Sequence, residues 1–306
     1  MAGTELEDLN ARFALRGELH FDIHEEGVLL AEISNRHAMA RIALHGAQVL
    51  AYQPHGAAPV IWLSSEARCV PGKTIRGGIP VCWPWFGPHP ESATKPAHGY
   101  ARTALWQILR TSATDTATQL ILELPMRSEY AALTPHAASL EATLCISVGA
   151  TLRVSLTTRN TGTIGVPLSQ ALHSYLNVSD IGAAQISGLE GCEYIDKVDG
   201  DLRRAQHGAI HIDSETDRIY LETDKDSVID DSGLRRRIRI KSEGSRSTVV
   251  WNPWVAKAQK LGDVGADGYR HMLCVETTNA ADDARQLAPG AEHTLTTEIS
   301  TDQIKQ

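Results

Sequence analysis

A histidine and a glutamate far apart in the sequence have neighbours that suit them for acid–base chemistry. His173 lies in SQALHSYLNVSD, where strand alternation would place it on one face with Tyr175 and Asn177. Glu276 follows the apolar run MLCV, where burial would disfavour its charged form. General acid–base catalysis uses imidazoles and tuned carboxylates of this kind. The structural alternatives are a hydrogen-bonded core histidine and a strand-end carboxylate turned back into water.

Two segments rich in glycine, proline and aromatic residues carry cationic side chains. RGGIPVCWPWFG begins with Arg76, and its two glycines would let the backbone approach a ligand closely. AHGYAR supplies His98 and Arg102. Guanidinium groups bind phosphate through several donors at once, so these loops together would form an anion pocket. The alternatives are a surface arginine beside a packed aromatic loop and a histidine that only supports the fold.

Other charged segments favour structural explanations. By residue types alone, DSETDRIY indicates a polar turn, and LRRRIRIK at 234–241 indicates a solvated strand face paired with neighbouring charges. His207 and His211 lack a third ligand of matching register, so no metal site is expected. Walker, Rossmann, kinase, GxSxG and HExxH patterns do not occur in the sequence.

The elements that must position these residues are short alternating runs such as VLLAEI, MARIAL, LILEL and RRIRIKS, separated by turn clusters. LEATLCISVGATLRVSLTT predicts a hairpin that turns at VGA. The pattern is all-β and favours a sandwich or barrel. We expect one domain over residues 16–300, with loosely held ends at 1–15 and 301–306. Segments 73–90, 95–106 and 251–279 break the strand rhythm and are expected to build a site.

Composition limits the function and the compartment. The 306 residues are 42% hydrophobic and 22% charged, as in a globular protein, and the net charge of −8 argues against nucleic-acid binding. Five scattered cysteines without a CxxC pair favour reduced thiols over disulfides or structural zinc. No secretory signal or membrane span is visible, so a cytoplasmic location is expected. The oligomeric state is left open, and a monomer is compatible with the sequence.

The punctuated segments together resemble a known family. Six motifs, matched in order between about His45 and about Pro289, are similar to the hexose-6-phosphate branch of the aldose 1-epimerases: IRGGIPVCWPWFG, PAHGYAR, LHSYLNVSDI, DSETDRIY, WNPW and MLCVE. This branch is the glucose-6-phosphate 1-epimerase, or hexose-6-phosphate mutarotase, family. The resemblance implies a galactose mutarotase-like fold, a large twisted antiparallel β-sandwich with few short helices and a site in its concave face.

The resemblance also implies roles for individual residues. His173 matches the acid that protonates the ring oxygen, and Glu276 matches the base that takes the anomeric hydroxyl proton. Four further residues match positions that hold the substrate, with the arginines near the phosphate: Arg76, His98, Arg102 and Asp217. The chain departs from many relatives at Ala97, where glutamine is usual, and in the segment ETTNA.

The implied reaction is the interconversion of the α and β anomers of a hexose 6-phosphate, with glucose 6-phosphate as the expected substrate. Ring opening and closure move protons but no hydride or electron, so this isomerase needs no metal or nicotinamide cofactor. The chemistry predicts a carboxylate and an imidazolium on opposite sides of one sugar ring. Two alternatives remain: a 1-epimerase for neutral aldoses such as galactose, and a non-catalytic carbohydrate-binding protein with the same fold.

Overall fold

The largest layer of the molecule is a twisted antiparallel sheet. The computed structural model describes residues 2–89, 91–131, 133–134 and 139–304. Within these residues, nine strands follow one another across this sheet, each antiparallel to its neighbours: β16 (Ile210–His211), β13 (Ala184–Ser187), β18 (Ser227–Asp231), β19 (Arg236–Glu243), β23 (Glu292–Gln303), β9 (Leu152–Asn160), β8 (Leu140–Gly149), β7 (Ala117–Glu123) and β6 (Gln107–Ala113).

Two further sheets and a short ribbon complete the described strands. The eight-stranded sheet contains β15 (Leu202–Ala205), β14 (Glu193–Asp196), β17 (Thr216–Leu221), β20 (Ser247–Asn252), β21 (Met272–Asn279), β11 (Gln170–Leu172) and β5 (Val81–Cys82), and β12 (Tyr175–Asn177) pairs with β21 beside β11. The four-stranded sheet contains β1 (Leu19–Ile23), β2 (Leu29–Ser34), β3 (Ala38–Ala43) and β4 (Gln48–Pro54). The ribbon joins β10 (Val166–Leu168) to β22 (Arg285–Leu287).

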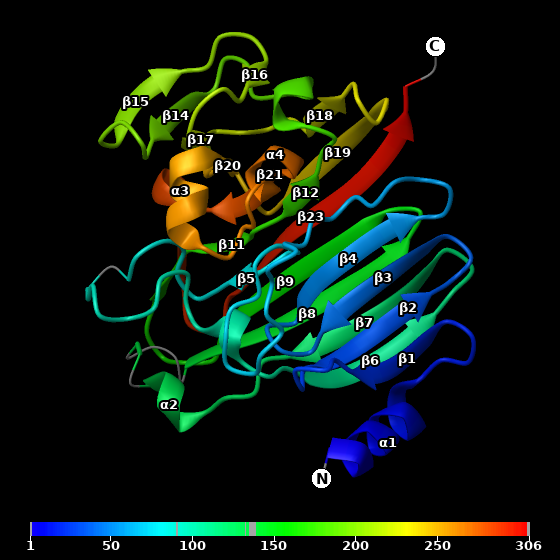
Figure 1. Cartoon of the computed structure of the whole chain (residues 1–306). Helices are drawn as coiled ribbons and strands as arrows, with labels where there is room; N and C mark the ends of the chain where they lie inside the picture. Colours follow the sequence, from blue (N-terminus) through cyan, green and yellow to red (C-terminus); the bar gives the residue numbers. More distant parts are fainter. Residues whose placement is uncertain (1, 90, 132, 135–138, 305–306) are drawn as a thin grey trace.

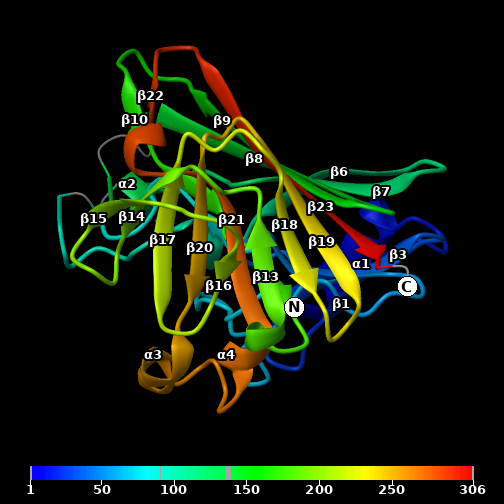
Figure 2. The ribbon, with the colours of Figure 1, turned by 90° about the horizontal axis from the view of Figure 1, so that it is seen from above.

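These layers form the predicted β-sandwich. Strand β8 of the nine-stranded sheet contacts β3 of the four-stranded sheet, and β23 contacts β11 and β21 of the eight-stranded sheet. Figures 1 and 2 show the four-stranded sheet against one end of the nine-stranded sheet and the eight-stranded sheet against the other. The predicted hairpin is β8–β9, with Leu152, Val154 and Leu156 fully buried between the layers. Alternation therefore predicted the buried face correctly because one side of β9 meets the core.

The helices are short and lie at the edges of the sandwich (Figure 1). Helix α1 spans Ala2–Phe13, α2 Ser128–Ala131, α3 Trp254–Leu261 and α4 Gly268–His271, with 3-10 turns η1 at Ala101–Thr103, η3 at Ile181–Ala183 and η4 at Ala281–Asp283. None of the described helices is both long and apolar enough to cross a membrane.

Both ends of the chain, which we expected to be loosely held, carry regular structure. The Asn10 side chain accepts a hydrogen bond from the Phe21 amide and donates one to the Phe21 carbonyl, which ties α1 to β1. At the other end, β23 continues to Gln303 through its pairing with β19, while residues 305–306 lie outside the described part. One domain over 16–300 stays a prediction.

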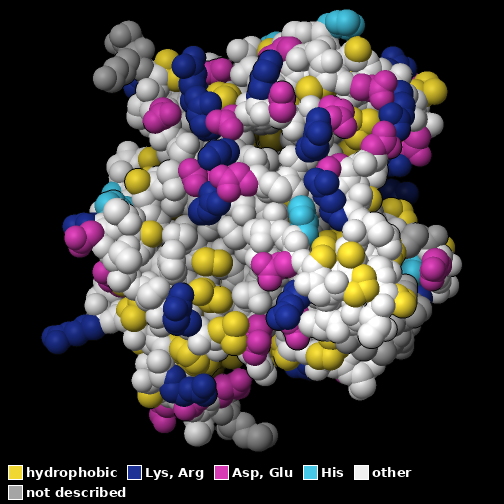
Figure 3. All heavy atoms as spheres, turned by 180° about the vertical axis from the view of Figure 1, so that it is seen from behind, with side chains coloured by type: hydrophobic (Ala, Val, Ile, Leu, Met, Phe, Trp, Pro, Cys, Tyr) yellow, Lys and Arg dark blue, Asp and Glu magenta, His cyan; other side chains and the backbone are white. Residues whose placement is uncertain are grey.

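The basic run at 234–241 mostly follows its prediction. Arg237 pairs with Asp230 and Arg239 with Asp226, and Figure 3 shows Lys and Arg interspersed with Asp and Glu over one face of the molecule. Arg236 differs, because its side chain is fully buried and donates to the carbonyls of Ala58 and Asn177. Alternation along β19 turns this one arginine inward, where backbone acceptors compensate for its burial.

Candidate active site

The structure brings all six residues singled out from the sequence to one cavity of about 290 Å³. It lies at the open face of the eight-stranded sheet, and the loops at 76–102 and helix α3 form its sides. The cavity is lined by Arg76, Phe86, His98, Arg102, His173, Tyr175, Asp217, Val249, Trp251, Lys257, Leu261 and Glu276. Asp217 and Glu276 converge because β20 lies between β17 and β21, and His173 joins them because β11 and β12 on either side of it both pair with β21.

His173 sits where the predicted strand is interrupted. The sequence predicted a continuous strand, but β11 ends at Leu172, β12 begins at Tyr175, and the His173 amide donates to the Pro80 carbonyl. The shared face with Tyr175 is correct: the two rings stack in parallel with centroids 4.7 Å apart. Trp251 meets the His173 ring edge-on at 6.1 Å. These contacts fix the imidazole while leaving 13% of the side chain exposed to the cavity.

Glu276 lies in the middle of β21, where every residue is buried. Its side chain is 1% exposed, so the alternative of a carboxylate turned back into water is wrong. The strand continues to Asn279 because β20 and β11 pair with its two edges while β23 covers one face. The polar residues that follow MLCV suggested that the strand ends at Glu276, whereas the enclosed strand continues and buries them as well.

The two groups are side by side, not on opposite sides of a ring as expected. Nδ1 of His173 lies 3.3 Å from Oε1 of Glu276, and Oε2 of Glu276 has no hydrogen-bond partner among the described residues. Burial raises the pKa of Glu276 well above its usual range, and Asp217 raises it further. Burial also lowers the pKa of His173 well below its usual range. Both shifts favour the neutral forms, a protonated carboxyl on Glu276 and an uncharged imidazole on His173.

Arg76 is held from two sides. Its Nε donates to Asp263 at 2.9 Å and its Nη1 donates to the Tyr175 hydroxyl at 3.0 Å. The following glycines were expected to approach a ligand, but they approach backbone instead. A Cβ on Gly78 would lie 2.3 Å from the Val49 carbonyl oxygen, so this loop can pass only without a side chain there.

His98 and Arg102 come from one tight loop. His98 adopts a left-handed backbone conformation with φ 63°, and its Nδ1 accepts a hydrogen bond from the Gly87 amide at 3.3 Å. Burial, with Arg102 and Arg76, lowers the pKa of His98 to about 3. The neutral ring therefore carries its proton on Nε2, which is left to donate into the cavity. Arg102 donates to the carbonyl of Ala97 at 2.8 Å and has no carboxylate partner among the described residues.

Asp217 was expected in a polar turn but is the second residue of strand β17. Burial raises its pKa even though Lys257 and Lys197 oppose the shift. Lys257 on α3 places its Nζ 3.9 Å from the Asp217 carboxylate and donates to Glu215 at 2.8 Å.

Sequence reasoning missed four residues that shape the cavity: Tyr175, Trp251, Lys257 and Asp263. Tyr175 could have been found as the aromatic residue two positions after His173, and Trp251 as the first residue of the WNPW motif. Lys257 could have been found only by predicting a helix after that motif, since it is the fourth residue of α3, which lies beside the cavity. Asp263 follows that helix and is placed by tertiary packing alone.

One group near the pair has the spacing of a metal site. Ligand atoms of His173, Cys274 and Glu276 lie within 4.8 Å of one another. Burial raises the pKa of the Cys274 thiol well above its usual range, and Glu276 raises it further. Because thiols bind metals as thiolates, this environment favours the protonated thiol over a metal ligand.

An antiparallel β-sandwich with a histidine–glutamate pair in such a cavity defines a mutarotase-like protein. The model of the aldose 1-epimerase family matches residues 30–300, and the chain belongs to that family. An Escherichia coli K12 protein named "Putative glucose-6-phosphate 1-epimerase" is 36% identical over 254 residues, 83% of this chain and 84% of that one.

Solved structures agree on the fold. A "putative mutarotase" from Salmonella typhimurium superposes with a TM-score of 0.88 at 30% identity, covering 98% of this chain and 99% of that one. A "galactose mutarotase-like protein" from Clostridium acetobutylicum superposes with a TM-score of 0.71 at 12% identity, covering 93% and 98%. The second likeness concerns the fold alone, and it extends the galactose mutarotase-like architecture to nearly the whole chain.

Proposed function

We propose that this protein is an isomerase that interconverts the α and β anomers of a hexose 6-phosphate, with glucose 6-phosphate as substrate. The observation that carries the proposal is the His173–Glu276 contact of 3.3 Å in a cavity that also holds Arg76 and Arg102. Two relatives that are 36% and 35% identical to this chain are both named "Putative glucose-6-phosphate 1-epimerase", which supports glucose 6-phosphate as the substrate.

The side-by-side geometry suits the reaction. The anomeric hydroxyl and the ring oxygen are bonded to the same carbon, so adjacent groups can serve both. Glu276 takes the hydroxyl proton while His173 protonates the ring oxygen, and the C1–ring oxygen bond breaks to give the open aldehyde. Rotation about C1–C2 presents the other face of the carbonyl, and closure returns both protons.

The arginines supply more than binding in this proposal. Their positive charges are among the causes that lower the pKa of His173. A phosphate dianion held by Arg102 and Arg76 offsets these charges, which favours transfer of the carboxyl proton from Glu276 to His173. Substrate binding therefore prepares the carboxylate as base and the imidazolium as acid.

The remaining cavity residues hold the sugar. His98 donates from Nε2, Asp217 accepts from ring hydroxyls, and Trp251 offers an apolar face to the C–H groups of the ring. Together they keep C1 beside the His173–Glu276 pair.

The direct test is exchange between α- and β-glucose 6-phosphate followed by NMR magnetisation transfer. Exchange faster than in buffer is expected, and exchange at the buffer rate overturns the proposal. Calorimetric binding without faster exchange would instead favour a carbohydrate-binding protein. Equal kcat/KM for glucose and glucose 6-phosphate would favour a neutral aldose 1-epimerase.

A further inference from the structure

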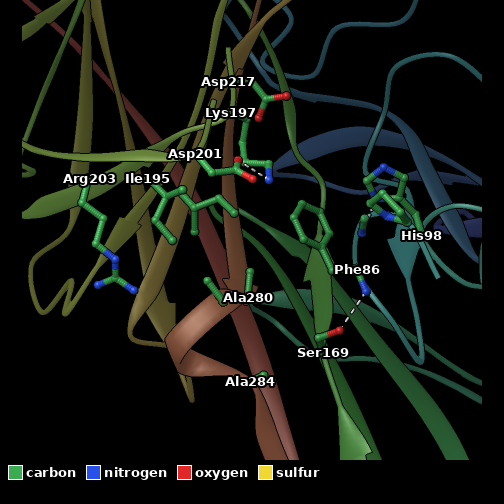
Figure 4. A pocket seen from close by; sticks show the side chains of 14 residues that line it. Phe86, His98, Ser169, Ile195, Lys197, Asp201, Arg203, Asp217, Ala280 and Ala284 are labelled. Atoms are coloured by element: carbon green, nitrogen blue, oxygen red, sulfur yellow. Dashed lines mark hydrogen bonds and ion pairs between the residues drawn. The ribbon is translucent and has the colours of Figure 1, made fainter. Parts of the chain in front are cut away.

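A second and larger cavity adjoins the one just described. Figure 4 shows the side chains that line it. It has a volume of about 690 Å³ and shares Phe86, His98 and Asp217 with the first cavity, so the two are adjacent. The first cavity, at about 290 Å³, lies at the lower end of the range of ligand pockets, which suits one sugar phosphate. A hexose 6-phosphate held at His173 and Glu276 therefore leaves the larger cavity free.

One row of the eight-stranded sheet forms the floor of both cavities. Glu276 pairs directly with Val249, Val249 with Ile219, and Ile219 with Ile195. Directly paired residues share a face of the sheet, and neighbouring strands are about 4.8 Å apart. Glu276 and Val249 line the first cavity, whereas Ile219 and Ile195 line the second. The row thus leads from the reacting pair to a point about 10–14 Å away.

The walls of the second cavity combine an apolar platform with balanced charges. Ile195 lies across the cavity from Phe86, as Figure 4 shows, and Ile219, its partner on the neighbouring strand, also lines this cavity. Lys197 pairs with Asp201 at 2.5 Å, and Arg203 pairs with Glu193 and Asp282. Because the cations already have carboxylate partners, this cavity favours a neutral ligand with hydroxyl groups and an apolar face over a second anion.

We propose that the second cavity is a subsite for a neutral glycosyl unit attached to the hexose on a hydroxyl remote from C1. The substrate class then includes disaccharides whose reducing-end hexose carries the 6-phosphate. The apolar C–H face of the second sugar packs on Ile195 and Ile219, and its hydroxyls meet the Lys197–Asp201 pair. This inference rests on the proposed function, since the reducing end must react at His173 and Glu276.

The test compares glucose 6-phosphate with 4-O-α-glucosyl-glucose 6-phosphate as substrates. The wild-type protein is expected to accelerate anomer exchange of both, with kcat/KM values within about tenfold. Ala284→Trp should fill the second cavity from an exposed position of the chain, and Ile195→Ala should remove half of the platform. Each should lower kcat/KM for the disaccharide by about tenfold or more and leave that for glucose 6-phosphate unchanged.

Ala288→Trp is the matched control, because Ala288 is also exposed and lines neither cavity. It should change neither rate. The subsite proposal is overturned if the wild-type protein accelerates anomer exchange of glucose 6-phosphate only. It is also overturned if Ala284→Trp and Ile195→Ala have the wild-type kcat/KM for both substrates. Failure with glucose 6-phosphate itself overturns the proposed function instead, so the two failures are distinguishable.

Discussion

Two glutamates in the same molecule have opposite environments. Glu276 lies in the cavity with one oxygen unpartnered among the described residues and a pKa raised well above its usual range. Glu243 lies on the surface, 42% exposed, where hydrogen bonds from Arg153 and Lys241 lower its pKa to about 2. On the surface, flexible cationic side chains and water stabilise the charged carboxylate of Glu243. In the cavity no cation pairs with Glu276 among the described residues, so its carboxyl stays protonated and can exchange its proton.

The largest expected effect is a difference in kcat between variants of the two glutamates. Glu276→Gln removes the proposed base and should lower kcat for glucose 6-phosphate by roughly 10²–10⁴-fold. The near-isosteric amide should preserve the fold, which circular dichroism would check. Glu243→Gln is the matched control and should leave kcat unchanged. Full activity in Glu276→Gln would contradict the role of this residue.

A second prediction extends the comparison to the cations. Arg102→Met should lower kcat/KM for glucose 6-phosphate by about 10- to 100-fold, since a hydrogen bond to a charged group contributes about 1.5–3 kcal/mol. The activity with unphosphorylated glucose should hardly change. Arg153→Met removes a surface arginine and serves as the control. If Arg102→Met affects both sugars equally, the phosphate does not bind there.

Stability should depend on pH with opposite signs at the two glutamates. The folded-state pKa of Glu276 is raised, so its contribution to stability is full below the usual value of 4.5 and is lost as the pH rises through the folded-state pKa. Relative to wild type, Glu276→Gln should therefore become more stable as the pH rises.

For Glu243 the contribution is present above 4.5 and is lost as the pH falls through about 2. Glu243→Gln should thus be slightly less stable than wild type at neutral pH and equal to it in acid. Urea unfolding at several pH values measures both. Parallel pH curves for the two variants would refute the contrast.

The smallest expected effect concerns the surface network itself. Arg153→Met should lower the free energy of unfolding by less than about 1 kcal/mol, because the ion pairs of Arg153 with Glu243 and Glu298 are partly exposed and screened by water. A loss of several kcal/mol in thermal or urea unfolding would mean that the surface network is far more structural than its exposure indicates.

Much of the fold could be predicted because one face of most strands meets the core. The β8–β9 hairpin and the inward face of β9 followed from alternation alone. The full length of strand β21 could not be predicted from alternation, because residues on both of its faces are buried. The interruption at His173 could not be predicted either, since it depends on the Pro80 carbonyl from a distant loop.

The candidate site was predictable where it lies in dense local motifs and not where it depends on long-range packing. The residue-type argument for Arg76, His98 and Arg102 rested on glycine, proline and aromatic residues nearby, and the structure places all three at the cavity. Lys257 lines the cavity and Asp263 holds Arg76 only because α3 and the residues after it pack beside the site. The residues next to Lys257 and Asp263 in the sequence do not indicate that these two lie near the site.

The close passage of the Gly78 backbone over Val49 has a consequence for protein engineering. A mutant library that randomises the loop around Arg76 would consist mainly of misfolded chains, because a side chain at Gly78 displaces the strand beneath it. Helix α3 tolerates more variation, since its residues Val255 and Leu261 are exposed and Lys257 and Leu261 face the cavity. Directed evolution toward other substrates should therefore vary the helix and keep the loop constant.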